Sequence, residues 1–202
     1  MSSSSIIINN NKSDTLLVSF AGHDMIYGQT PRFSFIQLFE THFKHIDRQF
    51  YIDIHVNSYH KGIGGISKTI DETITYLQKQ IEPYKRVIFI GTSAGGYAAI
   101  LFGSLLHVSS VIAFIPQTIR RNKLVDEKYR DISGYINDTT TYYLYADLSI
   151  KNPLDPHHVS QCDRIASHPN VVITKKDKFN IKEMRDGGEL HELIRKIIYE
   201  KE

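Results

Sequence analysis

The residues best suited to chemistry form a glycine-rich run in the middle of the chain, Gly91-Thr92-Ser93-Ala94-Gly95-Gly96. An apolar run precedes this Gly-x-Ser-x-Gly pattern and a helix-like stretch follows it, which predicts a serine on a sharp turn between strand and helix. Such a turn lifts the hydroxyl out of the sheet, and the flanking glycines leave room for its strained backbone. The start of the following helix also favours negative charge. The pattern therefore predicts that Ser93 is a nucleophile.

A serine hydroxyl needs a base to take its proton, and the chain contains ten histidines. His191 follows the last expected strand and stands at the start of the last expected helix, so it is the predicted base. The alternative is that His191 is a surface residue on a terminal helix. His157 and His158 come too early for this order and are expected to face solvent or to cap a helix.

Two aspartates compete for the role of the acid that orients the base. Asp147 directly follows the expected strand 141–146, and Asp155 comes eight residues later, before Pro156. As alternatives, Asp147 is a turn residue and Asp155 is a helix N-cap, a position that aspartate favours. The sequence leaves both open, with a slight preference for Asp155.

An acyl-transfer site also needs backbone N–H groups aimed at the reacting carbonyl oxygen. We expect one from Ala94, directly after the serine, and one from His23, where Gly22 lets the backbone approach closely. The alternative for His23 is an ordinary loop residue. A phosphate-binding loop would need a Lys-Ser/Thr pair, which the run around Ser93 lacks.

Short apolar runs alternate with longer amphipathic stretches along the whole chain. This pattern predicts an α/β fold: a three-layer α/β/α sandwich with a mostly parallel, doubly wound sheet of about six strands and a minimal lid. The expected strands are 16–22, 50–56, 86–91, 110–115, 141–146 and 171–174, and the expected helices are 30–43, 69–81, 94–107, 155–166 and 188–199.

The chain is expected to form one domain, residues 15–202, after a flexible Ser- and Asn-rich tail, residues 1–14. Within the tail, the run Ile6-Ile7-Ile8 is short enough to add an edge strand. Residues 116–139 are polar and lack an apolar period, so we interpret them as an inserted flap at the carboxyl edge of the sheet.

The amino-acid composition excludes several classes of binding partner. The net charge is +2 with Lys and Arg scattered among acids, which disfavours a nucleic-acid partner. The single cysteine, Cys162, excludes an intrachain disulfide, and no His, Cys or carboxylate cluster has metal-ligand spacing. No apolar run approaches the roughly 20 residues of a membrane span, and the first residues lack a secretion signal. We therefore expect a cytoplasmic protein without a membrane span, metal or cofactor; its oligomeric state is not readable.

Several of these features together resemble the α/β-hydrolase superfamily, especially its small bacterial-type members, some of which are associated with surface-polysaccharide or accessory-secretion genes. The resemblance spans roughly residues 16–198, although only the run around Ser93 is specific. It departs from the family at Glu189-Leu190-His191, where members often have Gly-His before the last helix. The features that carry the resemblance are the Ser93 run, Phe20-Ala21-Gly22-His23, Tyr145-Ala146-Asp147, Asp155-Pro156-His157-His158, Pro169-Asn170-Val171 and His191.

The resemblance implies ester or thioester hydrolysis, or acyl transfer, without a cofactor. We expect Ser93 to attack a carboxylic ester of a small molecule or glycan and to form an acyl-enzyme, with His191 as base. An acetylated sugar is the suggested substrate, because residues 129–145 are polar and rich in tyrosine. Two alternatives stay open: an acyltransferase using the same acyl-enzyme, and a non-catalytic binding module, which a His191 pointing away from Ser93 would favour.

Overall fold

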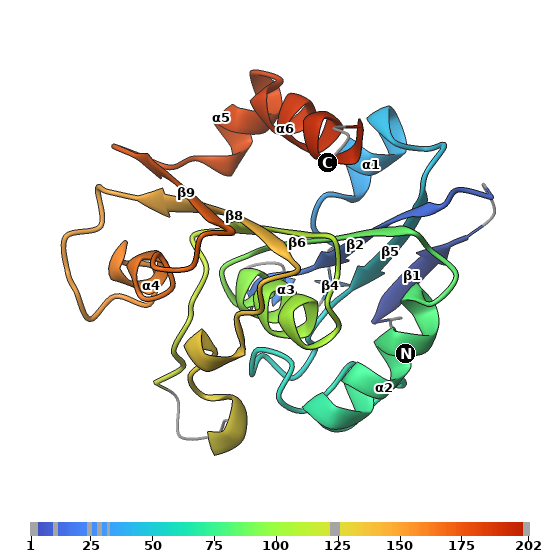
Figure 1. Ribbon diagram of the computed structural model, residues 1–202, viewed down its shortest axis with the longest axis horizontal. Coiled ribbons are helices and arrows are strands. Elements are labelled where there is room, and N and C mark those ends of the chain that lie inside the picture. Colours follow the sequence, from blue (N-terminus) through green and yellow to red (C-terminus); the bar gives the residue numbers. More distant parts are fainter. Residues whose placement is uncertain are drawn as a thin grey trace.

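A seven-stranded sheet lies between two layers of helices in the computed structural model, which describes residues 4–9, 12–23, 26–27, 30–31, 33–121 and 126–199 (Figure 1). Six strands are parallel and the edge strand β1 runs antiparallel to β5. The short run at Ile6–Ile8 thus does add an edge strand. In spatial order the strands are β1 (Ser5–Ile8), β5 (Asp47–Tyr51), β2 (Thr15–Phe20), β6 (Arg86–Thr92), β7 (Ser110–Phe114), β8 (Thr141–Asp147) and β9 (Val171–Lys176).

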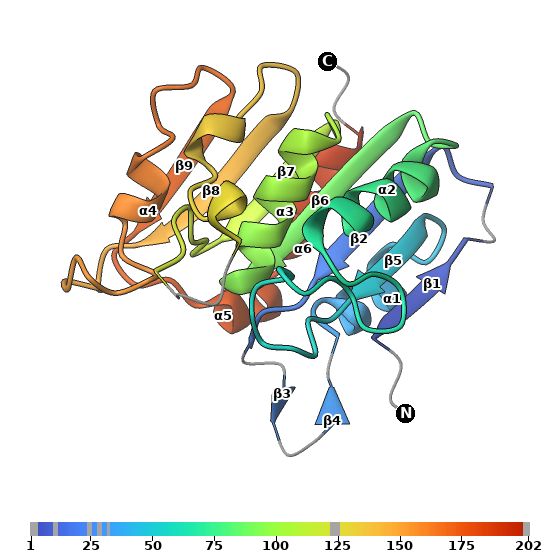
Figure 2. The same cartoon turned by 90° about the horizontal axis from the view of Figure 1, so that it is seen from below.

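The helices divide between the two faces of the sheet, as Figures 1 and 2 show from perpendicular directions. One face carries α1 (Ile36–His42), α5 (Ile181–Asp186) and α6 (Glu189–Tyr199). The other carries α2 (Ile70–Ile81), α3 (Ala94–Leu105) and α4 (Ser160–Asp163). The expected three-layer α/β/α sandwich with a mostly parallel, doubly wound sheet is confirmed.

Strand β6 shows why the sheet is covered on both faces. Val87 and Phe89 pack into the core under α2 and α3, whereas Ile88 and Ile90 pack into the core under α1 and α6. Successive side chains of a strand point to opposite faces, so a continuous apolar run requires two apolar layers. The buried strand places its carboxyl end, and the serine that follows it, at the centre of one sheet edge.

Some boundaries differ from the expected ones. The strand expected at 50–56 is β5, Asp47–Tyr51, because polar residues at its start are buried with partners. Asp47 accepts a hydrogen bond from the Tyr84 hydroxyl (2.8 Å), and the Arg48 guanidinium donates to backbone carbonyls. Beyond Tyr51 the chain leaves the sheet, since the Asp53 carboxylate binds amides of the following loop.

Two expected helices are shorter in the structure, and α5 was not expected. The helix expected at 30–43 begins only at Ile36, after Phe35 with a φ of 63°. Thr30–Pro31 instead forms β4, paired with β3 (Ile26–Tyr27). The helix expected at 155–166 is α4, Ser160–Asp163. Residues 148–159 are therefore a loop, which changes the site described below.

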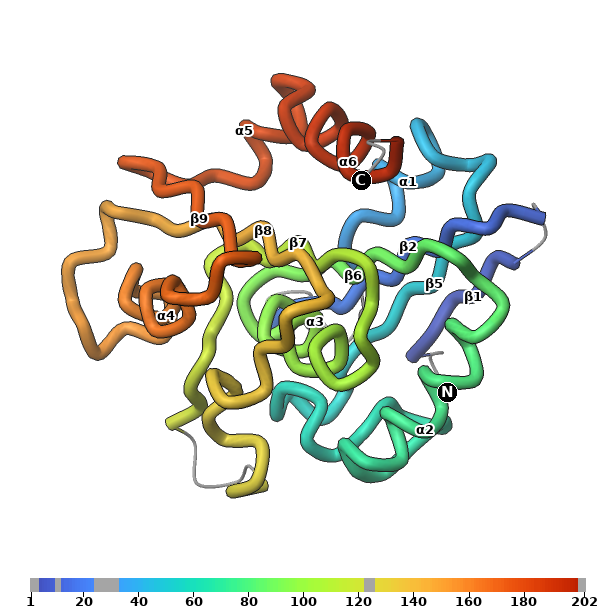
Figure 3. The backbone as a smooth tube through the Cα atoms, in the orientation of Figure 1, coloured from blue at the N-terminus to red at the C-terminus, as the bar shows by residue number. Residues whose placement is uncertain are grey.

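The segment expected to be a flap connects β7 with β8, and Figure 3 traces its path beside α3. Its first described part, 116–121, starts at the carboxyl edge. There the Thr118 N–H donates to the Gln161 side-chain oxygen, and the Thr118 hydroxyl donates to the Gln161 backbone carbonyl. Its second described part, 126–139, runs along α3: Ile132 is fully buried and the Asn137 amide donates to the Ser104 carbonyl (2.6 Å). The described part of the segment thus packs along α3 and is a crossover between parallel strands.

None of the helices in the described ranges combines the length and the apolar character needed to cross a membrane. Cys162 is buried in α4, and burial raises the pKa of its thiol to about 12.

Candidate active site

The run around Ser93 forms a strained turn between β6 and α3. Ser93 has φ 56° and ψ −117°, a backbone conformation that L-residues rarely adopt. A Cβ on Gly91 would lie 2.2 Å from the Gly95 carbonyl oxygen, and a Cβ on Gly95 would lie 2.1 Å from the Phe20 carbonyl oxygen. Both glycines are therefore required by sterics, as the sequence pattern predicted.

Backbone hydrogen bonds hold the turn in place. The Ser93 N–H donates to the Phe114 carbonyl on β7 (2.9 Å), and its own carbonyl accepts from Tyr97 N–H (3.0 Å). The Ser93 side chain is partly exposed at the carboxyl edge of the sheet. A hydroxyl in this position is open to a ligand while its backbone is fixed.

The ring of His157 lies directly beside this hydroxyl. Its Nε2 is 2.7 Å from Ser93 Oγ. On the other side of the ring, Nδ1 is 3.5 Å from Asp155 Oδ1, which also accepts a hydrogen bond from the His157 backbone N–H (2.8 Å). If Nε2 accepts the serine proton, the proton of the neutral ring stands on Nδ1, facing Asp155. Hydroxyl, imidazole and carboxylate thus form a Ser-His-Asp series.

Side-chain turns shape the loop that carries His157, residues 148–159, which we call the base loop. Asp147 accepts from Ser149 N–H (2.8 Å), Asn152 from Leu154 N–H (3.0 Å), and Asp155 from His157 N–H. Carboxylates and amides that bind the amide two residues on bend the chain into successive turns. The bends return the loop to the sheet edge, where His157 meets Ser93.

His191 is placed elsewhere, which corrects the expectation that it contacts Ser93. On α6, its ring stacks on His42 of α1, with centroids 4.2 Å apart, and it also contacts Phe43. Its Nδ1 lies 3.6 Å from Glu192. The physical reason is that α6 is amphipathic and docks beside α1, so His191 faces the neighbouring helix.

The loop after β9, where an acid-then-histidine order would place the base, holds an aromatic residue. The Phe179 ring lies 5.7 Å from the Phe114 ring and 6.3 Å from the Tyr145 ring, centroid to centroid. His157, expected to lie too early and to face solvent or cap a helix, stands beside the serine. The sequence feature that could have indicated His157 is the Asp155-Pro156-His157 stretch soon after β8. It points to the site only if these residues form a loop and not the start of a helix.

Asp147 and Asp155, the two candidates for the orienting acid, have different surroundings. Asp155 is the carboxylate beside His157. Asp147 is buried at the end of β8, and although burial raises its pKa, hydrogen bonds from Ser149 and from the Phe179 backbone amide outweigh this and lower it. Asp147 thus supports the start of the base loop and the loop that contains Phe179.

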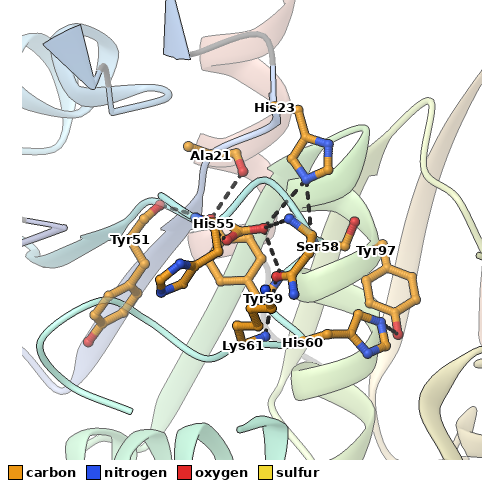
Figure 4. A network of polar contacts seen from close by, with 11 residues as sticks. Ala21, His23, Tyr51, His55, Ser58, Tyr59, His60, Lys61 and Tyr97 are labelled. Carbon is orange, nitrogen blue, oxygen red and sulfur yellow. Dashed lines mark hydrogen bonds and ion pairs between the residues drawn. The ribbon is translucent and has the colours of Figure 1, made fainter. Parts of the chain in front are cut away.

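The two expected oxyanion donors lie at the ends of neighbouring strands, since Phe20 of β2 is paired with Gly91 of β6. Ala94 is the first residue of α3, so its N–H has no acceptor within the helix. His23 follows β2, and its ring Nε2 accepts from Ser58 N–H (3.1 Å) and lies 3.5 Å from Asp53 Oδ2 (Figure 4). The His23 side chain therefore joins β2 to the loop between β5 and α2.

A buried polar network fills that loop (Figure 4). Asp53 accepts hydrogen bonds from the backbone amides of His55, Asn57 and Tyr59. Burial would raise the pKa of Asp53, but the contacts with His23 and with the Tyr59 and Asn57 amides outweigh it and lower the pKa. Local sequence patterns do not indicate this network, because His23 and the Asp53 loop come from separate parts of the chain.

His60 extends the network to α3. Its Nε2 pairs with the Tyr97 hydroxyl (3.0 Å), and its Nδ1 accepts from Asp126 N–H (3.0 Å). Burial, together with the positive charge of Arg120, lowers the pKa of His60 to about 4. The ring is therefore neutral at physiological pH.

A cavity of about 530 Å³ is lined by residues of α1, α5 and α6. Thr92, the residue before Ser93, forms part of its wall, and Lys182 and Arg185 of α5 supply cationic groups. Its apolar lining consists of Phe33, Phe35, Ile36, Leu38, Ile181 and Leu190. Among the residues that the structure describes, no group of three or more His, Cys, Asp or Glu side chains could hold a metal ion.

No protein-family profile and no curated protein matches the sequence. Solved structures do match the fold over nearly the whole chain. A lipase-esterase related protein from Clostridium acetobutylicum is 13% identical, with a TM-score of 0.63 over 96% of this chain and 98% of its own. A capsule O-acetyltransferase of Neisseria meningitidis serogroup A, in complex with CoA, is 12% identical, with a TM-score of 0.62 over 95% and 91%.

An esterase from Pyrococcus furiosus is 15% identical, with a TM-score of 0.60 over 96% of this chain and 90% of its own. These likenesses, with the strand order and the strained serine turn, show that the chain has an α/β-hydrolase fold. Because a fold hosts many activities, function has to be argued from the site.

Proposed function

We propose that this protein is a serine hydrolase that cleaves a carboxylic ester through an acyl-enzyme on Ser93. The observation that carries the proposal is the 2.7 Å contact between Ser93 Oγ and His157 Nε2. This distance lies within the roughly 2.6–3.2 Å that general-base catalysis requires. The contact occurs at a strained turn, a feature that clusters at functional sites.

The proposed reaction starts with His157 Nε2 removing the Ser93 hydroxyl proton as Oγ attacks the ester carbonyl carbon. The carbonyl oxygen becomes an oxyanion, for which the amides of Ala94 and His23 are the proposed donors. The imidazolium then gives its proton to the departing alcohol, and the acyl group stays on Oγ. Water, deprotonated by the same ring, attacks the acyl-enzyme, so that the acid is released and Ser93 regains its proton.

Asp155 is the proposed orienting group, replacing the open choice between Asp147 and Asp155. Its Oδ1 is 3.5 Å from His157 Nδ1, and its side chain is 38% exposed, with 29% for the histidine. At that distance and exposure, solvent screens much of the attraction to the imidazolium. Asp155 therefore contributes less than a buried triad carboxylate, and the Ser93–His157 pair carries most of the catalysis.

The proposed substrate is a small-molecule or glycan ester, with an acetylated sugar as the suggested case. The tyrosine-rich stretch lends it little support, because Tyr129 and Tyr142 are buried and hydrogen-bonded. The similarity to a structure named as a capsule O-acetyltransferase favours it instead. The cavity lined by Thr92 offers space beside the nucleophile for part of the ester.

Acyl transfer to a sugar is the second candidate, and the same neighbour favours it. Both reactions share the acyl-enzyme and differ in whether water or a hydroxyl attacks it. The non-catalytic alternative was tied to a His191 that points away from Ser93. His191 does lie elsewhere, but His157 supplies the imidazole.

The test is hydrolysis of p-nitrophenyl acetate by the wild type and by Ser93→Ala. We expect Ser93→Ala to lose activity by about 10⁴-fold or more, as the loss of a nucleophile does in serine hydrolases. Its circular dichroism and melting temperature should match those of the wild type. Activity above about one hundredth of the wild-type rate in the variant would contradict the proposal.

A further inference from the structure

A buried arginine acts electrostatically on the His60–Tyr97 pair and forms no ion pair with a residue that the structure describes. Arg120, in the segment after β7, is 9% exposed, and its Nε has no hydrogen-bond partner there. No ion pair of its guanidinium occurs in the described ranges, whereas its backbone N–H donates to the Arg130 carbonyl (2.8 Å). Its main chain is thus anchored, while the buried Nε of its guanidinium lacks the acceptor that a buried donor normally has.

Two neutral donors in the loop between β5 and α2 share this condition. Asn57 is 4% exposed and Ser58 is fully buried, yet Asn57 Nδ2 and Ser58 Oγ have no partner in the described part of the chain. Ser58 also has a φ of 60°, and its neighbour Tyr59 a φ of 65°. Unpaired buried donors and a left-handed backbone both cost free energy, and such costs are concentrated at binding and catalytic sites.

The positive charge of Arg120 acts on His60 and Tyr97 of the same network, and the negative charge of Asp53 acts on Arg120. The Asp53 oxygens are already engaged by three backbone amides and His23, so this carboxylate orders the loop and does not bind the guanidinium. Tyr97 stands one turn along α3 from Ser93, to which its N–H is bonded.

We propose that Arg120, with the Asn57 amide and the Ser58 hydroxyl, binds an anionic oxygen group, a carboxylate or a phosphate, on the substrate of the Ser93 site. The statement that this anion belongs to a substrate rests on the proposed function, whereas the anion site itself does not. A guanidinium fork matches the two oxygens of such groups, and neutral donors can complete their coordination. The enzyme would then act on an ester of an acidic sugar or of a phosphorylated one.

Calorimetry on the Ser93→Ala protein tests the site without turnover. The probes are glucuronate, glucose 6-phosphate and glucose, which share a sugar ring and differ in the anionic group. We expect one of the two anions to bind at least tenfold more tightly than glucose, and which one does so identifies the group. Equal affinity for all three, or no binding of either anion, overturns the proposal.

Arg120→Gln and Arg121→Gln form a matched pair, because they remove the same charge from adjacent positions. Arg121 is exposed, and its guanidinium donates to the Leu154 carbonyl. In the Ser93→Ala background, Arg120→Gln should weaken binding of the preferred anion at least tenfold, and Arg121→Gln by less than twofold. Equal losses in both variants mean that general charge attraction, and not this site, binds the anion.

A purely structural role for Arg120 predicts a different result. Removing an unpaired buried charge should leave the melting temperature of the ligand-free protein unchanged or raise it. If Arg120→Gln lowers the melting temperature, Arg120→Lys replaces it as the test variant and is expected to fold and to bind the anion less tightly than arginine does. Anion affinity in Arg120→Lys equal to that of the arginine protein contradicts the proposal. Hydrolysis of neutral p-nitrophenyl acetate by the wild type reports separately on the proposed function, whatever calorimetry shows.

Discussion

The serine turn, residues 91–96, and the base loop supply the two partners of one hydrogen bond, but different forces shape them. Gly91, Ala94 and Gly95 are buried, and backbone contacts at 2.1–2.2 Å would exclude any side chain at the two glycines. The base loop is largely exposed, with Leu154 69% accessible, and aspartate and asparagine turns hold it. Packing thus fixes Ser93, whereas local polar contacts place His157. Substitutions should therefore damage the two regions in different ways.

The largest effect that separates the two histidines is expected in catalysis. His157→Ala should lower kcat/KM for p-nitrophenyl acetate by about 10³-fold, within the range attributed to general-base catalysis. His191→Ala should stay within about threefold of the wild type, since its ring packs on His42 of α1. Initial-rate kinetics check both. If His191→Ala were the inactive variant, the base assignment made from the structure would be wrong.

The second largest expected effect is a loss of stability when a side chain is added in the serine turn. Gly95→Ala should lower the free energy of unfolding by about 3 kcal/mol, because its Cβ would meet the Phe20 carbonyl oxygen on a rigid strand. Gly134→Ala is the matched control, since nothing lies within 4 Å of its Cβ, and it should change the value by less than about 0.5 kcal/mol. Urea unfolding followed by circular dichroism measures both. Equal stability of the two variants would show that the turn is not sterically constrained.

The buried network beside the turn should make stability depend on pH. The folded-state pKa of His60, about 4, is below its ordinary value of 6.5, so only the unfolded chain binds the proton between these values. His60 therefore contributes stability that is complete above pH 6.5 and is lost as the pH falls toward 4. The loss should reach about 3 kcal/mol, from about 1.4 kcal/mol per pKa unit.

Urea unfolding at pH 7, 6, 5 and 4 measures this dependence. His60→Asn should flatten the curve between pH 6.5 and 4, whereas His107→Asn, at an exposed position, should retain the wild-type slope. A wild-type stability that does not fall over this interval would contradict the neutral, buried state of His60.

The smallest expected effect concerns Asp155 in the base loop and Asp147 at the end of β8. Asp155→Asn should lower kcat by about tenfold, less than the roughly 10⁴-fold of a buried triad carboxylate, because the 3.5 Å contact is partly exposed. Asp147→Asn should act mainly on stability, since Asp147 binds Ser149 and the Phe179 amide. Measuring both kcat and the unfolding midpoint of each variant distinguishes the catalytic effect of Asp155→Asn from the stability effect of Asp147→Asn. A larger kcat loss in Asp147→Asn would return the acid role to Asp147.

The sequence was sufficient for the fold and for the serine turn because both depend on local signals. Apolar runs such as Val87-Ile88-Phe89-Ile90 specify a strand buried on both faces. The Gly-x-Ser-x-Gly spacing specifies a turn in which residues other than glycine do not fit at positions 91 and 95. The close backbone contacts at Gly91 and Gly95 explain why. These features need no knowledge of distant parts of the chain.

The contact of His157 with Ser93 could not be predicted in the same way. Asp155-Pro156 has the signature of a helix start, but its carboxylate binds the His157 amide within a turn, and α4 begins only at Ser160. His191 fits the expected chain order, yet its orientation depends on how α6 docks against α1. The network around Asp53, and the unpaired Arg120 near it, likewise depend on tertiary contacts.

The most direct test of the central claim, that His157 activates Ser93, is the rate and position of labelling by a fluorophosphonate, which phosphonylates activated serines. Peptide mass spectrometry should locate the label on Ser93 in the wild type, with a rate that falls at least about 100-fold in His157→Ala and is unchanged in His191→Ala. A label on another residue, no label at all, or a Ser93 labelling rate that does not depend on His157 would contradict the claim.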